Sequence, residues 1–280
     1  MNQLRPDQRA CVIACLCEGN SLRSTVRLTG VHRTTIQNLL VELGRACSEY
    51  QDEAFRNLTC KRLQCDEVWS FVGCKEKNVT MEKKAKGQGD CWTWTAIDAD
   101  TKLIPAWFVG TRDGGAAYHF MHDLAGRLAN RVQLTTDGHK AYLSAVEDAF
   151  GTNIDYAMLN KIYGAAPEAA QHRYSPAQCM GAKKAIINGQ PEYAHVSTSF
   201  VERSNLTLRM SNRRFTRLTN AFSKKIENHE AAAALFFMHY NFCKIHGSLR
   251  MTPAMAAGVT TKIWEVADII ALLDTQEAAA

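Results

Sequence analysis

The hydrophobic pattern of the chain changes its period once, near residue 61, and this change constrains the fold more than any other feature. Before it, apolar side chains recur three and four positions apart, as they do in amphipathic helices. After it, β-branched and aromatic runs of strand length come first in hairpin order and then alternate with helical segments. We therefore predict a small all-α unit followed by a mixed α/β unit within the 280 residues.

Composition narrows the class of protein. The chain has 33 Lys and Arg against 28 Asp and Glu, a net charge of +5, and 46% of its residues are hydrophobic, which excludes collagen-like and wholly disordered proteins. Its longest strongly apolar stretch, residues 231–238, is too short to span a membrane, and the first twenty residues lack a signal-peptide layout. We expect a cytoplasmic protein with no membrane partner. The ten cysteines show no paired zinc-ligand spacing, so we interpret most of them as small buried residues.

The first fifty residues have the spacing of a helix-turn-helix. Ser21 is a suitable N-cap for a second helix, Gly30 supplies a tight turn, and a third helix follows over residues 31–44. The third helix leaves outside the polar side chains that could reach base edges or phosphates: Arg33, Thr34, Thr35, Gln37 and Asn38. The alternative is an ordinary three-helix packing unit.

The second part of the chain predicts a mixed sheet with helices. Expected strands cover residues 63–73, 92–97, 103–109, 132–136 and 154–162, and expected helices cover 114–128, 141–150, 200–218 and 225–244. Residues 75–89 form a basic, polar excursion. The irregular segment 164–199 is long for a loop inside a domain, which indicates a functional loop.

Positive charge is concentrated late in the chain. Seven Lys and Arg and no acidic residue lie between Arg203 and Lys225, which favours a polyanionic partner, although a solvated helix face is the ordinary alternative. In a helix over 200–218, Arg209 and Arg213 share a face with Glu202, and Asn205 lies close to it. The candidate DNA contacts of this segment are Asn205, Arg209, Arg213, Arg214 and Arg217.

Three acidic residues stand at the edges of expected elements: Asp66 within a strand, Asp137 at the end of another, and Glu202 near a helix start. Each has an ordinary explanation by itself, as a turn residue or a charge at a helix N-terminus. Together, two or three carboxylates are the hard oxygen ligands that Mg²⁺ prefers, and paired ions of this kind support phosphodiester transfer. Alternation along the strand points Glu67 to the opposite face, away from such an ion.

Longer words surround these acids: CDEVWSFVG at 65–73, TDGHKAY at 136–142 and VERSNLTLR at 201–209. They resemble the three catalytic blocks of bacterial DDE transposases of the Insertion Sequence One family. Flanking words extend the similarity over about residues 60–270: STSF at 197–200, RRFTR at 213–217, NAFSKK at 220–225, YNF at 240–242 and TPAMA at 252–256. The chain lacks the zinc finger that often precedes the helix-turn-helix in the better-known members.

The resemblance implies a ribonuclease-H-like mixed-sheet core, preceded here by the helix-turn-helix. It assigns the metal-ligand and catalytic roles to Asp66, Asp137 and Glu202, with Mg²⁺ as cofactor and Mn²⁺ as a substitute. The implied partners are the terminal inverted repeats and the target, both double-stranded DNA, in a bacterial, nucleoid-associated setting. We expect a homodimer or higher oligomer, because two ends must be handled together. The expected domains are a DNA-binding unit at 1–50, a linker at 51–61, a catalytic domain at 62–270 and a tail at 271–280.

Two other functions stay open from the sequence. One is a sequence-specific DNA-binding protein whose catalytic domain has decayed, and the other is a ribonuclease-H-like nuclease or resolvase that cuts without joining. Three histidines, His139, His195 and His246, could assist proton transfer or contact phosphate. Trp69 and Trp92 are expected in the core rather than as platforms for base stacking.

Overall fold

The structure, a computed structural model, describes residues 4–164 and 179–279. Its helices are α1 (Pro6–Cys17), α2 (Leu22–Thr29), α3 (Arg33–Ala54), α4 (Met81–Ala85), α5 (Gly114–Arg127), α6 (Ala141–Phe150), α7 (Ser199–Ser211), α8 (Ile226–Phe242), α9 (Pro253–Ala256) and α10 (Val266–Ala279). Its strands are β1 (Arg62–Val72), β2 (Gly89–Asp98), β3 (Ala106–Gly110), β4 (Val132–Asp137), β5 (Ile154–Tyr163) and β6 (Cys179–Asn188). Short 3₁₀ turns lie at η1 (Glu76–Asn78), η3 (Tyr193–His195) and η4 (Arg213–Phe215).

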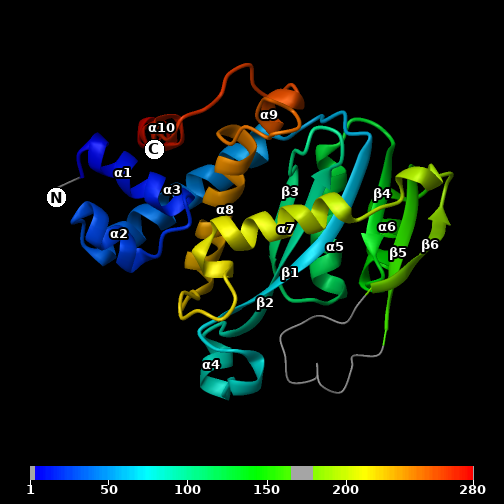
Figure 1. Cartoon of the computed structure of the whole chain (residues 1–280), viewed down its shortest axis with the longest axis horizontal. Coiled ribbons are helices and arrows are strands. Elements are labelled where there is room, and N and C mark those ends of the chain that lie inside the picture. Colours follow the sequence, from blue (N-terminus) through cyan, green and yellow to red (C-terminus); the bar gives the residue numbers. More distant parts are fainter. Residues whose placement is uncertain (1–3, 165–178, 280) are drawn as a thin grey trace.

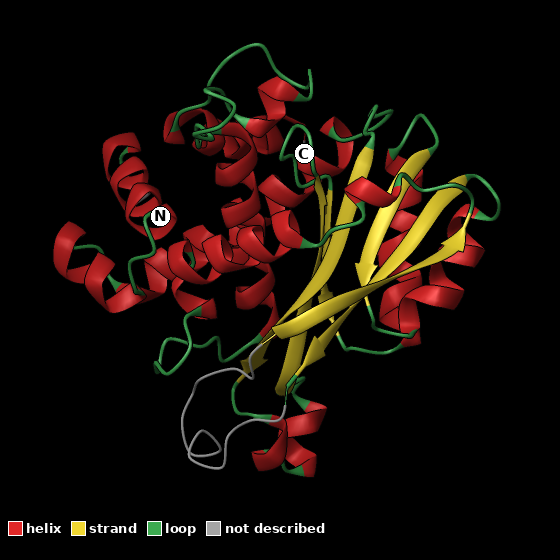
Figure 2. Cartoon of the chain, turned by 45° about the vertical axis from the view of Figure 1, so that its right-hand side comes forward, coloured by secondary structure: helices red, strands yellow, loops and turns green. Residues whose placement is uncertain are grey.

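One six-stranded sheet in the order β3-β2-β1-β4-β5-β6 forms the centre of the molecule. The first three strands are antiparallel, β4 and β5 run parallel to β1, and β6 is antiparallel to β5. Helices α5 and α6 cover one face, and α7 crosses the other, with α8 beside it (Figure 1). Figure 2 shows the twist of the sheet between these layers. This mixed topology confirms the ribonuclease-H-like core predicted from the sequence.

The N-terminal helices pack onto the catalytic part through α3 and α8. Gly44 of α3 lies so close to α8 that a Cβ atom there would come within 2.5 Å of the Ala231 Cα. Buried residues from both predicted domains, such as Ile36 of α3 and Leu235 of α8, belong to one hydrophobic cluster. No described helix is long and apolar enough to cross a membrane.

Helices run across two of the expected domain boundaries. The third helix does not stop at residue 44 but continues through Ala54, and Phe55 and Leu58 behind it are buried, so residues 51–61 are packed structure. Helix α10 begins before the expected tail at 271–280 and continues to Ala279. The apolar contacts on α8 and α10 outweigh the weak local period that suggested a linker.

Two element predictions in the second half need correction. The expected helix over 200–218 ends at Ser211, because Asn212 leaves the helical conformation, donates to the Ala232 carbonyl (2.8 Å) and accepts from the Arg214 N–H (3.2 Å). The segment 164–199 was predicted to be irregular, yet it contains strand β6, which pairs with the preceding strand β5. Pro167 and Pro176, on which the loop prediction also relied, lie outside the described residues.

Candidate active site

The register of the sheet brings two of the candidate carboxylates together. Cys65 of β1 stands opposite Thr136 of β4 in a parallel pair, so that the next residues, Asp66 and Asp137, are neighbours. Asp137 is the last residue of β4 and lies at the carboxyl end of that strand. Ligand and catalytic groups gather at such edges because the chain leaves the sheet there.

Helix α7 carries the third carboxylate to the same edge. The buried Gln64 side chain accepts hydrogen bonds from the backbone N–H groups of Phe200 (2.8 Å) and Val201 (3.2 Å), which fixes the start of α7 on β1. Free N–H groups at a helix start need such partners. Glu202 follows in the first turn, where the Thr198 hydroxyl donates to its Oε1 (2.5 Å).

All three carboxylates line one cleft of about 720 Å³. The cleft also contains several basic and polar side chains: Arg112, His139, Lys140, Asn160, Lys161 and Thr198. The predicted site residues Asp66, Asp137 and Glu202 are therefore brought together, although nothing in this geometry alone assigns them a reaction. Of the three histidines that the sequence offered, only His139 lines this cleft.

Glu67 lies closer to the other acids than strand alternation predicted. One oxygen from each of Asp66, Glu67 and Asp137 lies within 4.8 Å of the other two. Arg112 Nε donates a hydrogen bond to Glu67 Oε2 (3.1 Å). Arg112 also reaches the Asp137 carboxylate at 3.7 Å. Glu67 is thus close to the other two acids, and the expectation that it does not bind the same ion as Asp66 stays a prediction.

The acidic cluster has the electrostatics of a cation site. Burial, reinforced by Asp137, raises the pKa of Asp66 to about 6, and the same two causes raise the pKa of Glu67 to about 7. The buried Tyr142 hydroxyl lies beside the Glu67 carboxylate and partly opposes this rise in its pKa. Clustered carboxylates are a hard donor set that fits a divalent ion such as Mg²⁺.

The immediate neighbours of the acids were not predicted from the sequence in these roles. Asn205 is buried; its amide donates to Asp66 Oδ2 (2.8 Å) and its carbonyl oxygen accepts from the Thr95 hydroxyl (3.1 Å). Lys161, at the end of β5, forms an ion pair with Glu202. The sequence holds no signal that would have identified Lys161 in this role. For Arg112, which precedes α5, the sequence holds no such signal.

Several residues predicted to contact DNA also have partners within the protein. Asn205 holds Asp66, and the Arg209 guanidinium donates to the backbone carbonyls of Phe215 (3.2 Å) and Trp69 (3.1 Å). Arg214 donates to the Ser223 hydroxyl (2.8 Å). Because α7 ends at Ser211, Arg213 does not continue the stripe of Glu202 and Arg209, but Arg213 and Arg217 are both exposed.

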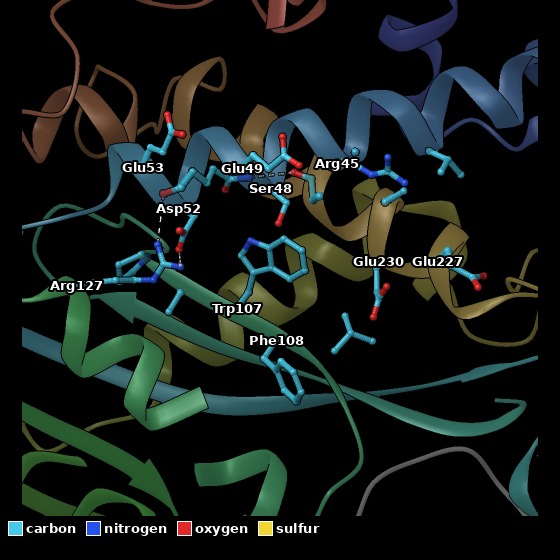
Figure 3. A pocket seen from close by; sticks show the side chains of 18 residues that line it. Arg45, Ser48, Glu49, Asp52, Glu53, Trp107, Phe108, Arg127, Glu227 and Glu230 are labelled. Atoms are coloured by element: carbon cyan, nitrogen blue, oxygen red, sulfur yellow. Dashed lines mark hydrogen bonds and ion pairs between the residues drawn. The ribbon is translucent and has the colours of Figure 1, made fainter. Parts of the chain in front are cut away.

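A separate groove between α3, β3 and α8 is lined mainly by acidic side chains, in contrast to the basic segment after α7 (Figure 3). It measures about 660 Å³, and Figure 3 shows Trp107 on its floor with acidic side chains around it. Five acidic residues, Glu49, Asp52, Glu53, Glu227 and Glu230, line it together with two arginines, Arg45 and Arg127. A polyanion is therefore disfavoured on this side of the molecule.

The comparisons with known proteins point to one class of enzyme. A family model for the DDE domain of IS240-type transposases matches residues 82–166, a range that includes Asp137 but neither Asp66 nor Glu202. This match supports a DDE transposase, a class that uses divalent metal ions and acts on DNA. Membership of the Insertion Sequence One family stays a prediction.

Two further comparisons add little. No curated protein sequence matches the chain. Among solved structures, a chain of the piggyBac transposase synaptic complex with hairpin DNA is 9% identical with a TM-score of 0.39, and the alignment covers 97% of this chain and 71% of that one. This likeness is too slight to bear on fold or function.

The raised pKa values predict an unusual pH dependence of stability in metal-free protein. A carboxyl whose pKa is higher in the folded than in the unfolded state binds protons more tightly when folded, so its contribution to stability falls as pH rises. For Asp66 this loss runs from about pH 4 to about pH 6. We expect Asp66→Asn to flatten the dependence of the unfolding free energy on pH in that window, as measured by urea denaturation in EDTA. Parallel curves for both proteins would contradict a raised pKa at Asp66.

Proposed function

We propose that this chain is a transposase that cleaves and joins DNA strands at the ends of an insertion sequence. The observation that carries the proposal is the convergence of Asp66, Asp137 and Glu202, from three distant segments, on one cleft. The DDE-domain match over the central part of the chain supports the same class of reaction. In this reaction water, and then a freed 3′-hydroxyl, attacks a phosphodiester.

The three acids would hold the metal ion, and Glu67 lies close enough to Asp66 and Asp137 to take part. Bound there, Mg²⁺, or Mn²⁺ as a substitute, would polarise the phosphate and lower the pKa of an attacking water. Asn205 orients Asp66 by donating a hydrogen bond to its Oδ2, and the backbone N–H of Glu67 donates to its Oδ1 (2.9 Å). Arg112 offsets part of the negative charge at Glu67 and Asp137.

Basic side chains of the cleft would position the DNA backbone. Lys140 and Lys161 stand on its walls, and Lys161 already contacts a carboxylate oxygen of Glu202. A phosphate entering beside Glu202 would meet this ammonium group, since Lys161 lies next to Glu202. Ammonium groups bind phosphate oxygens as point charges. In this proposal Lys161, which pairs with Glu202, would be available to bind a phosphate oxygen of the DNA.

The N-terminal unit supports recognition of double-stranded DNA. Gly30 adopts a left-handed backbone (φ +70°) between α2 and α3, as a tight helix-turn-helix requires. Arg33, Thr34, Thr35 and Asn38 are exposed and Gln37 is partly exposed. Arg33 and Gln37 also line a groove of about 660 Å³ with Arg213, Lys224 and Lys225, and no acidic residue of the described part of the chain lines it. This groove joins the expected recognition helix to the basic segment after α7.

Replacing Arg33 or Gln37 by Ala tests base recognition. If each side chain reads a base, each change is expected to weaken binding to the terminal repeats by about 1–3 kcal/mol and binding to unrelated DNA by less. Fluorescence anisotropy with both DNAs measures the difference. Arg45→Ala is the matched control, because Arg45 is exposed on the same helix but lines the acidic groove. Equal losses on both DNAs would mean phosphate contact only, and no loss would make the unit a structural one.

Incubation with end DNA and Mg²⁺ separates this proposal from the two others. Joined products support a transposase, binding without cleavage supports a decayed DNA-binding protein, and cleavage without joining supports a nuclease or resolvase. Native mass measurement of the complex tests the expected homodimer or higher oligomer. A single protomer on a pair of ends would contradict that expectation.

A further inference from the structure

Another cavity, distinct from the carboxylate cleft and the two grooves, lies between the end of β1 and the loop that follows α7. It measures about 430 Å³ and contains three half-buried aromatic rings, Trp69, Phe71 and Phe222. The ring centroids lie 5.8 Å apart for Trp69 and Phe71 and 4.7 Å apart for Phe71 and Phe222, with tilted planes. Trp69 is thus not enclosed in the core as the sequence suggested. We call this cavity the aromatic pocket.

Positive charge surrounds the aromatic pocket. Four cations line it, Lys75, Arg209, Arg214 and Arg217, and among the described residues no Asp or Glu does. None of the four forms an ion pair within the described residues. The Lys75 ammonium group lies 5.6 Å from the centre of the Trp69 ring, and Arg217 is exposed at the mouth.

Two of these cations are held in place by the protein. Arg209 is fixed by two backbone carbonyls, and Arg214 is fixed by the Ser223 hydroxyl. The other terminal nitrogen of Arg214, Nη2, is buried and has no hydrogen-bond partner in the described part of the chain. Burial lowers the pKa of both guanidinium groups to about 10, which leaves them charged at neutral pH. Buried charges without a counterion are costly, so an anion at this pocket would stabilise them.

We propose that the aromatic pocket binds one unpaired nucleotide of the DNA strand, with its base on the aromatic rings and its phosphate on the cations. This inference rests on the proposed function for its substrate, DNA. Aromatic faces accept any base by stacking, and surrounding Lys and Arg bind the backbone. An acidic peptide would use the charge but has no planar group to match three rings.

The position of the pocket relates it to the cleavage site. Trp69 is three residues beyond Asp66 in β1, about 10 Å at ~3.3 Å per residue. Helix α7 also connects the two sites. It carries Glu202, and its Arg209 side chain donates a hydrogen bond to the Trp69 carbonyl. A strand whose scissile phosphate lies at the carboxylates could therefore place a nearby unpaired nucleotide in the pocket.

The test compares a base-bearing strand with one of equal charge that has no bases. Full-length protein in EDTA is titrated with fluorescein-labelled dT8 and with an abasic eight-residue phosphodiester. We expect dT8 to bind more tightly, and Trp69→Ala or Phe222→Ala to weaken dT8 binding by about 5- to 100-fold while leaving the abasic strand unchanged. Arg217→Ala should weaken binding of both strands. Tyr118→Ala removes an exposed ring from α5 and serves as the control.

Several results would overturn the proposal. Equal affinity of wild-type protein for dT8 and the abasic strand would remove the stacking role, and so would unchanged dT8 binding by the Phe222→Ala protein with a native circular dichroism spectrum. Displacement of dT8 by an oligoglutamate peptide at lower concentration than by unlabelled dT8 would assign the pocket to a protein. Because the assay needs no metal and no cleavage, its result is independent of the joining reaction. The pocket can bind a nucleotide in a protein that does not join strands, and a protein that joins strands can lack this pocket interaction.

Discussion

Asp66→Asn, Asp137→Asn and Glu202→Gln are each expected to lower metal-dependent strand cleavage by at least about 1000-fold, which is about 4 kcal/mol in activation free energy. Each change removes one negative oxygen donor from the cleft but keeps the size of the side chain. Binding to end DNA should stay close to that of the wild-type protein, because the expected base contacts lie on α3. Cleavage of a labelled end fragment in Mg²⁺ and anisotropy in EDTA measure the two properties separately.

Two controls make this result specific. Glu147→Gln neutralises an exposed acid on α6 outside the cleft and should leave cleavage unchanged. Glu67→Gln decides which acid completes the site: we expect most cleavage to remain, since Glu67 is held by Arg112. Loss of cleavage in Glu67→Gln with full activity in Glu202→Gln would replace Glu202 by Glu67 among the ligands.

Gly44→Ala is expected to destabilise the protein by about 2–3 kcal/mol. The added Cβ would lie 2.5 Å from both Cα and Cβ of Ala231 and 2.8 Å from its carbonyl oxygen, so α3 and α8 would have to separate. Overpacking of this kind costs about 1–3 kcal/mol and sometimes more, and the better helix propensity of Ala returns at most about 1 kcal/mol. Urea denaturation measures the change.

Gly126→Ala is the matched control in another helix. Gly126 lies near the end of α5, and the nearest atom to an added Cβ is Arg56 Nη1 at 3.9 Å, an ordinary contact. This substitution should be neutral or stabilise the protein by up to about 1 kcal/mol. If Gly44→Ala behaved like Gly126→Ala, the close packing of α3 on α8 would be refuted.

Much of the fold follows from the local sequence. The β-branched and aromatic runs of strand length predicted the hairpin order of the first strands, and the later alternation of strands and helices predicted a mixed α/β domain. The sequence could not reveal β6, whose side chains are mostly exposed and show no period of two, because its strand form depends on pairing with β5. The end of α7 depends on the bond from Asn212 to α8, which is also a contact between distant segments.

The candidate site shows the same division. The motif words predicted that Asp66, Asp137 and Glu202 act together, whereas the register that places Asp66 beside Asp137 depends on the pairing of β1 with β4. Glu67, Arg112 and Lys161 could not be placed, since their roles depend on the twist of the sheet and on side-chain reach. The internal partners of Asn205 and Arg209 could not be predicted for a related reason: a helical projection gives a face of α7, but only the tertiary structure shows that this face lies on β1.

The most direct test of the account is a joining assay with a pre-cleaved end. A terminal-repeat duplex carrying a free 3′-hydroxyl is incubated with the protein, Mg²⁺ and a supercoiled plasmid, beside the same duplex with a 3′-deoxy terminus. The account predicts covalent joining of the 3′-hydroxyl end to the plasmid, none with the 3′-deoxy end, and none by the Asp66→Asn protein. Joining that persists with the 3′-deoxy end, or plasmid cleavage without any joined product, would contradict a strand-transfer enzyme.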